Sequence, residues 1–159
     1  MILSERMNAK LSEAEEILAL AAERGRESSL PYAGEVTPQE AYRLFAEHDA
    51  RIIDVRSAFE FAYIGRVPGT PLIPWKHWPS GELNANFLAE LDEACANDEI
   101  VLFLCRSGVR SHSTATVAAA AGYTQAFNIA EGFEGDLDQH RQRGNIGGWR
   151  KAGLPWVQD

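Results

Sequence analysis

The feature that most constrains this chain is an unbroken apolar run, IVLFL at residues 100–104, which leads straight into a polar, glycine-containing turn. A strand buried on both faces has this pattern, because the side chains that point to either side must all be apolar. The next segment, residues 109–121, is rich in alanine and is followed by Gly122, which predicts a helix. A buried strand, a tight turn and a helix in this order favour an α/β fold with a parallel sheet.

Other parts of the chain alternate between strand and helix patterns in the same way. Residues 51–55 (RIIDV) and 126–129 have the composition of short strands. The TPQE segment at 37–40, and Ser57 with Glu60, are capping signals that each predict the start of a helix. The predicted helices run over residues 38–45, from the Ser57 cap through Tyr63, and over 87–96. We expect helices on both faces of the sheet.

The first thirty residues form a segment of their own. Apolar residues recur at three- and four-residue steps from Leu11 to Ala21, which predicts an amphipathic helix ended by Gly25. Residues 31–35 are expected to be a linker. We therefore divide the chain into a helical extension at 1–30 and a domain at 35–159. The extension packs on the domain's own surface in one interpretation and binds a partner in the other.

Length and charge exclude several classes of protein. The chain has 159 residues, which suits one domain, and 15 basic against 23 acidic residues give a net charge of −8. This charge argues against general nucleic-acid binding, which needs a basic face. Two cysteines are too few for a disulfide framework or a four-cysteine zinc site. With no apolar run long enough to cross a membrane and no apolar signal core, we expect a cytoplasmic protein.

The turn after the apolar strand contains the candidate active site. Its residues are Cys105, Arg106, Ser107, Gly108, Val109 and Arg110. In a parallel sheet such a turn directs backbone N–H groups into one concavity at a helix N-terminus, where a thiolate is stabilised. The segment from 100 to 130 contains no Asp, Glu or Lys, so its two arginines form a local basic site suited to a small anion. The alternative is an inert, buried Cys105.

Other candidate residues have weaker arguments. Asp54 and Arg56, just past a predicted strand, are interpreted as supports for the loop rather than as an acid–base pair. The 75–78 segment (WKHW) forms one wall of the pocket or fills the core. Cys95, within a predicted helix, is interpreted as filler, and His112 as a solvated or core histidine. A metal site at His140 is discounted because no second histidine lies nearby.

Several motifs together show a resemblance to a known family. They are Ile53-Asp54-Val55-Arg56, Gly65-Arg66-Val67-Pro68-Gly69, the turn from Cys105 to Arg110, and Trp149 with Ala152-Gly153-Leu154-Pro155. In this order and spacing, the chain resembles the single-domain rhodaneses, which are sulfurtransferases, over about residues 35–159. The resemblance implies a parallel five-stranded sheet flanked by helices. It also implies that Cys105 is a nucleophile that carries a persulfide and that Arg106 to Arg110 form the active-site loop.

The residue types fit this chemistry. A thiolate at Cys105 attacks the outer sulfur of a donor such as thiosulfate, and a cyanide or thiol acceptor then removes that sulfur. We expect a small anionic donor and a thiol or protein acceptor, with Arg106 and Arg110 orienting the donor. Arg110 has an alternative use in a structural salt bridge. The reaction needs neither a metal nor an organic cofactor, and we expect no nucleic-acid or membrane partner.

Two departures from the family pattern leave the substrate open. The first thirty residues are extra, and the polar segment 134–148 separates Phe133 from Trp149. This segment covers the site entrance or contacts an acceptor protein. Two other functions stay open: a binding module without turnover, and a phosphatase or arsenate reductase. The latter enzymes use a cysteine loop with five residues before the arginine, whereas four separate Cys105 from Arg110.

Overall fold

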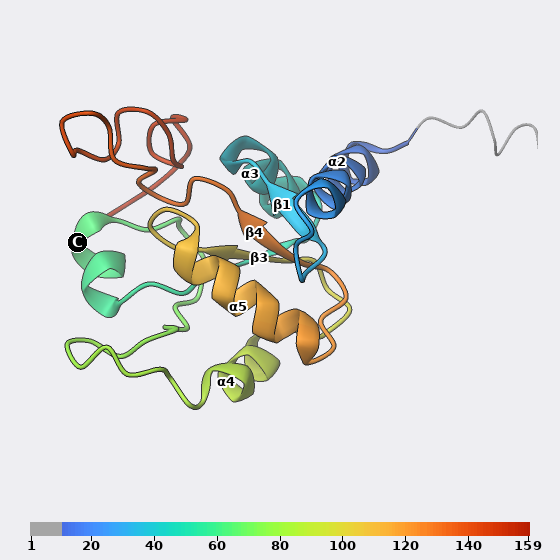
Figure 1. Cartoon of the computed structure of the whole chain (residues 1–159), viewed down its shortest axis with the longest axis horizontal. Helices are drawn as coiled ribbons and strands as arrows, with labels where there is room; N and C mark the ends of the chain where they lie inside the picture. The colour runs from blue at the N-terminus through green and yellow to red at the C-terminus, as the bar shows by residue number, and fades with distance from the viewer. Residues whose placement is uncertain (1–10) are drawn as a thin grey trace, which may run out of the picture.

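The structure, a computed structural model, describes residues 11–159, and element names follow the labels of Figure 1. Its centre is a sheet of four parallel strands in the order β1-β4-β3-β2. The strands are β1 (Gly34–Val36), β2 (Arg51–Asp54), β3 (Val101–Leu104) and β4 (Ala126–Ile129). The short β1 lies at one edge of the sheet and β2 at the other.

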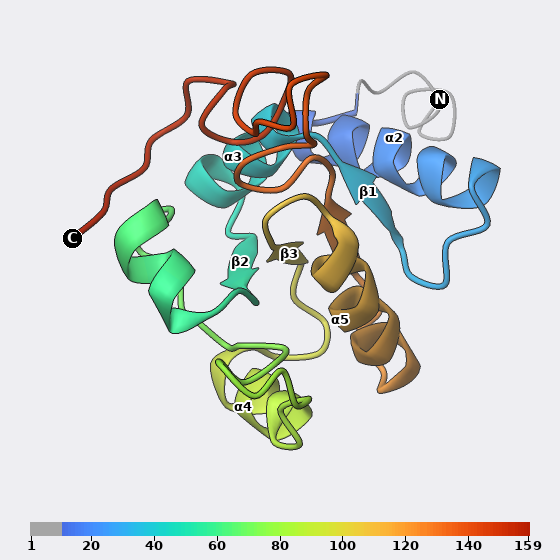
Figure 2. The same cartoon turned by 60° about the vertical axis from the view of Figure 1, so that its left-hand side comes forward.

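Helices cover both faces of this sheet, which confirms the predicted α/β class (Figures 1 and 2). Helices α2 (Glu13–Glu27) and α3 (Pro38–Glu47) lie on one face, and α4 (Phe87–Ala94) and α5 (Val109–Ala120) lie on the other. The apolar run of β3 explains the two layers. Leu102 and Leu104 pack with α2 and α3, whereas Val101 and Phe103 pack with α4 and α5.

The predicted capping signals are present where a helix begins. Thr37 Oγ1 accepts the Glu40 N–H, and the Glu40 carboxylate accepts the Thr37 N–H, so α3 starts with a complete capping box. The same exchange joins Ser57 and Glu60. There, however, the chain continues as a short π-helical turn, η1 (Glu60–Ile64), rather than as an α-helix. No helix within residues 11–159 is long and apolar enough to cross a membrane.

The sheet has four strands where the resemblance implies five. Beyond β2 the pairing within residues 11–159 is irregular: one parallel bridge joins Asp54 to Leu72, and the Trp75 N–H donates to the Val55 carbonyl at 3.1 Å. Asp54 donates its N–H to the Pro71 carbonyl and accepts the Ile73 N–H, at 3.1 and 2.8 Å. Pro71 and Pro74 flank these residues and have no N–H to donate, which interrupts a regular ladder on this side of the sheet.

The predicted linker at 31–35 is wrong, because it runs into a strand. β1 begins at Gly34 and pairs with β4, at the edge of the sheet where α2 packs across it. A Cβ at Gly34 would collide with the backbone carbonyl of Ala21, so glycine allows the helix and the strand to touch. Gly25 does not end α2 as predicted. It is buried inside the helix, which continues to Glu27.

Candidate active site

The active-site turn begins where β3 ends. Cys105 follows Leu104 directly and is buried, with 1% of its surface exposed. Gly108 caps the start of α5 in a left-handed conformation, with φ at 107°, which a residue with a side chain adopts only under strain. This conformation directs the Gly108 N–H to the Cys105 Sγ at 3.1 Å. One backbone N–H is therefore within hydrogen-bond distance of the sulfur, and the convergence of several N–H groups stays a prediction.

A second donor to the sulfur comes from Ser111, in the first turn of α5. Its Oγ lies 3.2 Å from the Cys105 Sγ and 2.6 Å from the Asn128 Oδ1 on β4. Because the hydroxyl has one proton, Ser111 donates to either the sulfur or the amide at a given moment. The Asn128 Nδ2 donates to the Gly108 carbonyl at 3.0 Å. Asn128 therefore contacts both residues that face the Cys105 sulfur, Gly108 and Ser111. The sequence analysis identified neither Asn128 nor Ser111 as part of the site.

The turn at residues 131–135 fixes the backbone of the active-site loop through hydrogen bonds. Phe133 donates its N–H to the Cys105 carbonyl at 2.8 Å, and Glu134 donates to the Arg106 carbonyl at 2.9 Å. Gly132 has φ at 63°, and a Cβ there would lie 2.6 Å from the Cys105 carbonyl oxygen. The turn therefore requires glycine, and it connects the active-site loop to the polar segment 134–148.

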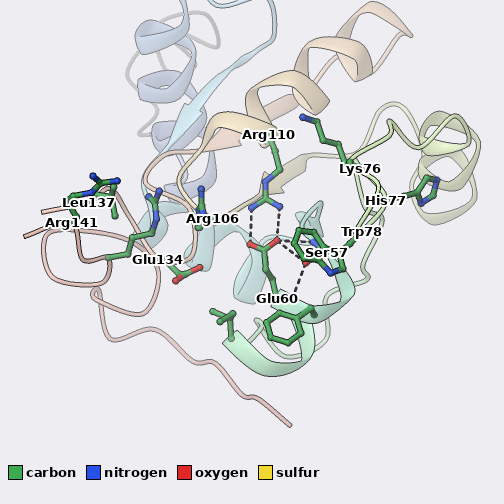
Figure 3. A pocket seen from close by; sticks show the side chains of 14 residues that line it. Ser57, Glu60, Lys76, His77, Trp78, Arg106, Arg110, Glu134, Leu137 and Arg141 are labelled. Atoms are coloured by element: carbon green, nitrogen blue, oxygen red, sulfur yellow. Dashed lines mark hydrogen bonds and ion pairs between the residues drawn. The ribbon is translucent and has the colours of Figure 1, made fainter.

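Arg110 is held by a carboxylate. Its Nη1 and Nη2 donate to the two oxygens of Glu60 on η1, at 2.7 and 2.9 Å (Figure 3). Burial raises the pKa of Glu60, but hydrogen bonds and charge from Arg110 outweigh that effect and lower it to about 2. The ion pair in turn raises the pKa of Arg110. Arg110 thus has the structural salt bridge that was one of its two predicted uses, and its contact with a donor stays a prediction.

Asp54 and Arg56 form a second, fully buried ion pair. The Arg56 Nη2 lies 2.7 Å from Asp54 Oδ2 and donates to the Gly65 carbonyl at 2.6 Å. Gly65 ends η1, the turn that carries Glu60. The pair therefore fixes the position of η1, and η1 reaches the active-site loop through Glu60 and Arg110. The interpretation of the two residues as supports for the loop, rather than as an acid–base pair, stays a prediction.

A pocket of about 710 Å³ opens beside the loop. Its lining is Ser57, Phe59, Glu60, Ile64, Lys76, His77, Trp78, Gly81, Arg106, Arg110, Glu134, Leu137, Arg141 and Arg143. Figure 3 shows the segment around Lys76 and the segment around Arg141 on opposite sides of the Arg110–Glu60 ion pair. Cys105 is not in this lining, whereas Arg106 and Arg110 from the same loop are.

Both segments that the sequence left open contribute to this pocket. In the 75–78 segment, Trp78 is 76% exposed and lines the pocket, whereas Trp75 packs edge-on against Phe87 in the core. Both predicted roles of that segment therefore occur, in different residues. The 134–148 segment supplies Glu134, Leu137, Arg141 and Arg143 to the opposite wall.

The pocket is strongly cationic although the chain has a net charge of −8. Lysine and arginine provide five of its lining residues, and glutamate provides two. Both carboxylates already face arginines: Glu60 pairs with Arg110, and Glu134 lies 3.6 Å from Arg150. No carboxylate in the described part of the chain pairs with Arg106. Anions are therefore attracted to this pocket.

The 134–148 segment is organised by one aspartate. Asp138 accepts the backbone N–H groups of His140 and Gln142 at 2.8 and 3.0 Å. It also accepts the side-chain amide of Asn145 at 2.7 Å. These hydrogen bonds lower the pKa of Asp138, with the Asn145 contribution the largest. They close the turn that carries Arg141, so hydrogen bonds fix the backbone of this wall.

The remaining candidate residues lie outside the pocket. Cys95 is buried at the end of α4, and burial raises the pKa of its thiol. The His112 Nδ1 lies 2.7 Å from the Tyr32 hydroxyl. Within residues 11–159, one group has three possible metal ligands close together: Glu13, Glu47 and His48. It lies in the α2–α3 region, where Glu13 and Glu47 pair with Arg43, and it is separate from Cys105.

Fold and site together define a parallel α/β protein with a cysteine at a strand-to-helix turn beside a cationic pocket. The family model described as Rhodanese-like domain matches residues 37–138. The chain therefore belongs to the rhodanese-like family, as the resemblance predicted. Relatives in this family include proteins named as sulfurtransferases.

Three similar proteins illustrate the match. A crystal structure of Rv0390 from M. tuberculosis has a TM-score of 0.73 and 40% identity, covering 80% of this chain and 99% of that one. The uncharacterized protein RP600 of Rickettsia prowazekii is 34% identical over 117 residues, 71% of this chain and 87% of the relative. The thiosulfate sulfurtransferase GlpE of Actinobacillus succinogenes is 28% identical over 121 residues, 76% of this chain and 87% of the relative.

Proposed function

We propose that this protein transfers a sulfane sulfur from a small anionic donor, such as thiosulfate, to a thiophilic acceptor through a persulfide on Cys105. The observation that carries the proposal is the environment of the Cys105 Sγ. The Gly108 N–H donates to this sulfur, the Ser111 hydroxyl lies 3.2 Å from it and is shared with Asn128, and a cationic pocket adjoins its loop. Donors aimed at a sulfur stabilise negative charge on it.

The first half-reaction loads the enzyme. The Cys105 thiolate attacks the outer sulfur of thiosulfate, a new S–S bond forms, and the donor's S–S bond breaks to release sulfite. The negative charge then lies on the outer sulfur of the persulfide, where N–H and O–H donors stabilise it. In the second half-reaction cyanide or a thiolate takes that sulfur, and Cys105 leaves as the thiolate.

The two arginines of the loop have different roles in this proposal. Arg110 is engaged by Glu60, so it fixes the start of α5 and adds positive charge to the pocket. Arg106 is exposed and lines the pocket without a carboxylate partner among the described residues, so it is the group that meets the anionic donor. A binding module without turnover would not need two donors aimed at a buried thiol.

Intact-protein mass spectrometry tests the proposal. After incubation with thiosulfate, the protein should gain the mass of one sulfur atom, and cyanide or dithiothreitol should remove it. Cys105→Ser should lose this adduct. Cys95→Ser is the matched control and should keep it, because Cys95 lies at the end of α4 outside the pocket. Full turnover by Cys105→Ser would overturn the assignment, and hydrolysis of an aryl phosphate in place of sulfur transfer would favour the phosphatase alternative.

A further inference from the structure

The pocket beside Cys105 is much larger than the proposed donor. A volume of about 710 Å³ lies within the range of roughly 300–1,000 Å³ that encloses drug-sized ligands. Thiosulfate or cyanide would occupy only a small part of it, near Arg106 and Arg110. The rest of the pocket, between the Lys76–Trp78 wall and the 134–148 wall, is therefore available to a larger molecule.

The chemistry of the two outer walls indicates what that molecule is. One wall provides Lys76, and the other provides Arg141 and Arg143. No ion pair joins these three cations to a carboxylate within residues 11–159, so their charge faces the pocket uncompensated. Apolar side chains also line the pocket: Phe59 is 56% exposed, and Trp78, on the same wall as Lys76, is also exposed. The complementary ligand has several negative charges and some apolar surface.

The 134–148 wall is held in place by hydrogen bonds within the protein. Its cations lie on the turn closed by Asp138, and the Arg143 Nη1 donates to the Gly135 carbonyl at 2.8 Å. The same segment joins the active-site loop, because the Glu134 N–H donates to the Arg106 carbonyl at 2.9 Å. The position of this wall is therefore tied to the loop that carries the reactive sulfur.

We infer that the acceptor of the sulfur is a multiply anionic low-molecular-weight thiol, whose charged body is bound by Lys76, Arg141 and Arg143. The inference rests on the proposed persulfide at Cys105. The outer sulfur of the persulfide takes a proton from solvent, and the acceptor thiolate then attacks that sulfur and forms a new S–S bond. The bond between the two persulfide sulfurs breaks, Cys105 takes the electron pair as a thiolate, and the acceptor leaves as a persulfide with the proton.

A comparison of acceptors tests the inference. The rate constant for discharge of persulfide-loaded protein is measured with coenzyme A, with glutathione and with 2-mercaptoethanol, each at an equal thiolate concentration. Coenzyme A provides phosphates and glutathione provides carboxylates. A comparison of the two therefore shows which of these anionic groups the pocket binds better. We expect the rate constants with coenzyme A and with glutathione to be larger than the rate constant with 2-mercaptoethanol. Added salt should lower their rate constants more than that of 2-mercaptoethanol, whose reacting thiolate carries a single charge, because salt screens charge.

Matched variants locate the effect. Lys76→Gln and Arg141→Gln remove one charge from opposite walls, and each should lower the ratio of anionic to neutral rate constants about fivefold. Arg26→Gln is the control, since Arg26 is exposed on α2 outside the pocket, and its ratio should equal that of the parent. A ratio that is unchanged in both pocket variants, or that falls equally in Arg26→Gln, would overturn the inference.

A binding measurement separates this inference from the proposed function. S-methyl coenzyme A and S-methyl glutathione cannot accept sulfur, so calorimetric titration with them reports on the pocket alone. We expect binding that weakens with salt and in Arg141→Gln. If these compounds do not bind while persulfide transfer proceeds, the acceptor assignment is wrong. If they bind but no persulfide forms on Cys105, the proposed function is wrong and the pocket assignment stands.

Discussion

Glu60 and Arg110 are 50 residues apart in the chain and form a two-point ion pair, with N–O distances of 2.7 and 2.9 Å. The pair joins the π-helical turn η1 to the first turn of α5, so it connects the edge of the sheet to the active-site loop. It also commits the guanidinium of Arg110 to a carboxylate within the protein, so in the proposed reaction Arg106 is the arginine that meets a small donor.

The ion pair predicts a pH-dependent contribution to stability. The pKa of Glu60 is lowered from 4.5 to about 2 in the folded protein, so the contribution is fully present above pH 4.5 and is lost as the pH falls toward 2. Glu60→Gln should lower the free energy of unfolding by on the order of 2–3 kcal/mol at pH 7. Urea unfolding of both proteins between pH 7 and pH 2.5 should show this difference shrinking below pH 4.5. A difference that stays constant over that range would contradict the prediction.

Asn128 should act as a positioning residue for the sulfur. Asn128→Ala removes the acceptor for Ser111 and the donor to Gly108, so the positions of the Ser111 hydroxyl and of the Gly108 turn beside Cys105 are no longer fixed. We expect a loss of about 1–3 kcal/mol in stability and roughly tenfold or more in the rate of persulfide formation. Asn128→Asp is the matched variant, because it keeps the oxygen that accepts from Ser111. Persulfide formation at the parental rate in a folded Asn128→Ala protein would rule out this role.

The length of the active-site loop should determine the reaction. Inserting one glycine after Ser107 would displace the Gly108 N–H from its 3.1 Å contact with the Cys105 Sγ. Loss of one aligned donor typically costs ~10²–10³ in rate, so sulfur transfer should fall steeply. The fold should survive, because surface loops tolerate insertion. Circular dichroism and the sulfur-transfer assay measure the two effects, with aryl phosphate hydrolysis measured alongside. A folded variant with the parental transfer rate would show that loop length does not select the reaction.

Asp138 should control the local order of the pocket wall without affecting the whole fold. Asp138→Ala removes the acceptor for the N–H groups of His140 and Gln142, so those amides should exchange with solvent faster. The melting temperature should change by no more than about 2 °C, because the side chain lies on an exposed loop. Hydrogen exchange followed by mass spectrometry measures the first effect and calorimetry the second. Unchanged exchange at residues 138–145 would show that other contacts hold this wall.

Much of the fold could be predicted because the evidence for it is local. The apolar run that becomes β3 and the capping box at Thr37 each lie within a few residues. β1 could not be predicted, because its three residues include a glycine and show no periodicity. Gly25 has the usual signature of a helix end, but its actual role depends on contact with Gly34, which is visible only in three dimensions.

The residues of the active site also fall into two groups: those that the sequence could predict and those that it could not. Cys105 and Gly108 could be identified from their positions in the turn, because a strand-to-helix turn directs both toward one point. Asn128 and Glu60 lie far from that turn in the sequence, so local patterns could not connect them to it. The lining role of Arg141 depends on how an irregular segment folds back, and segments without periodicity give no such information.

The position of β1 has a consequence for anyone who shortens this chain. In the sheet as described, β1 is the neighbour of β4 on one side, although the family match begins only at residue 37. A fragment cut at that boundary would lose α2 and β1 and would leave the hydrogen-bonding groups of β4 facing solvent. Unpaired strand edges recruit other strands, so such a fragment should self-associate or precipitate. Soluble expression therefore calls for a starting point before the Ser12 cap of α2.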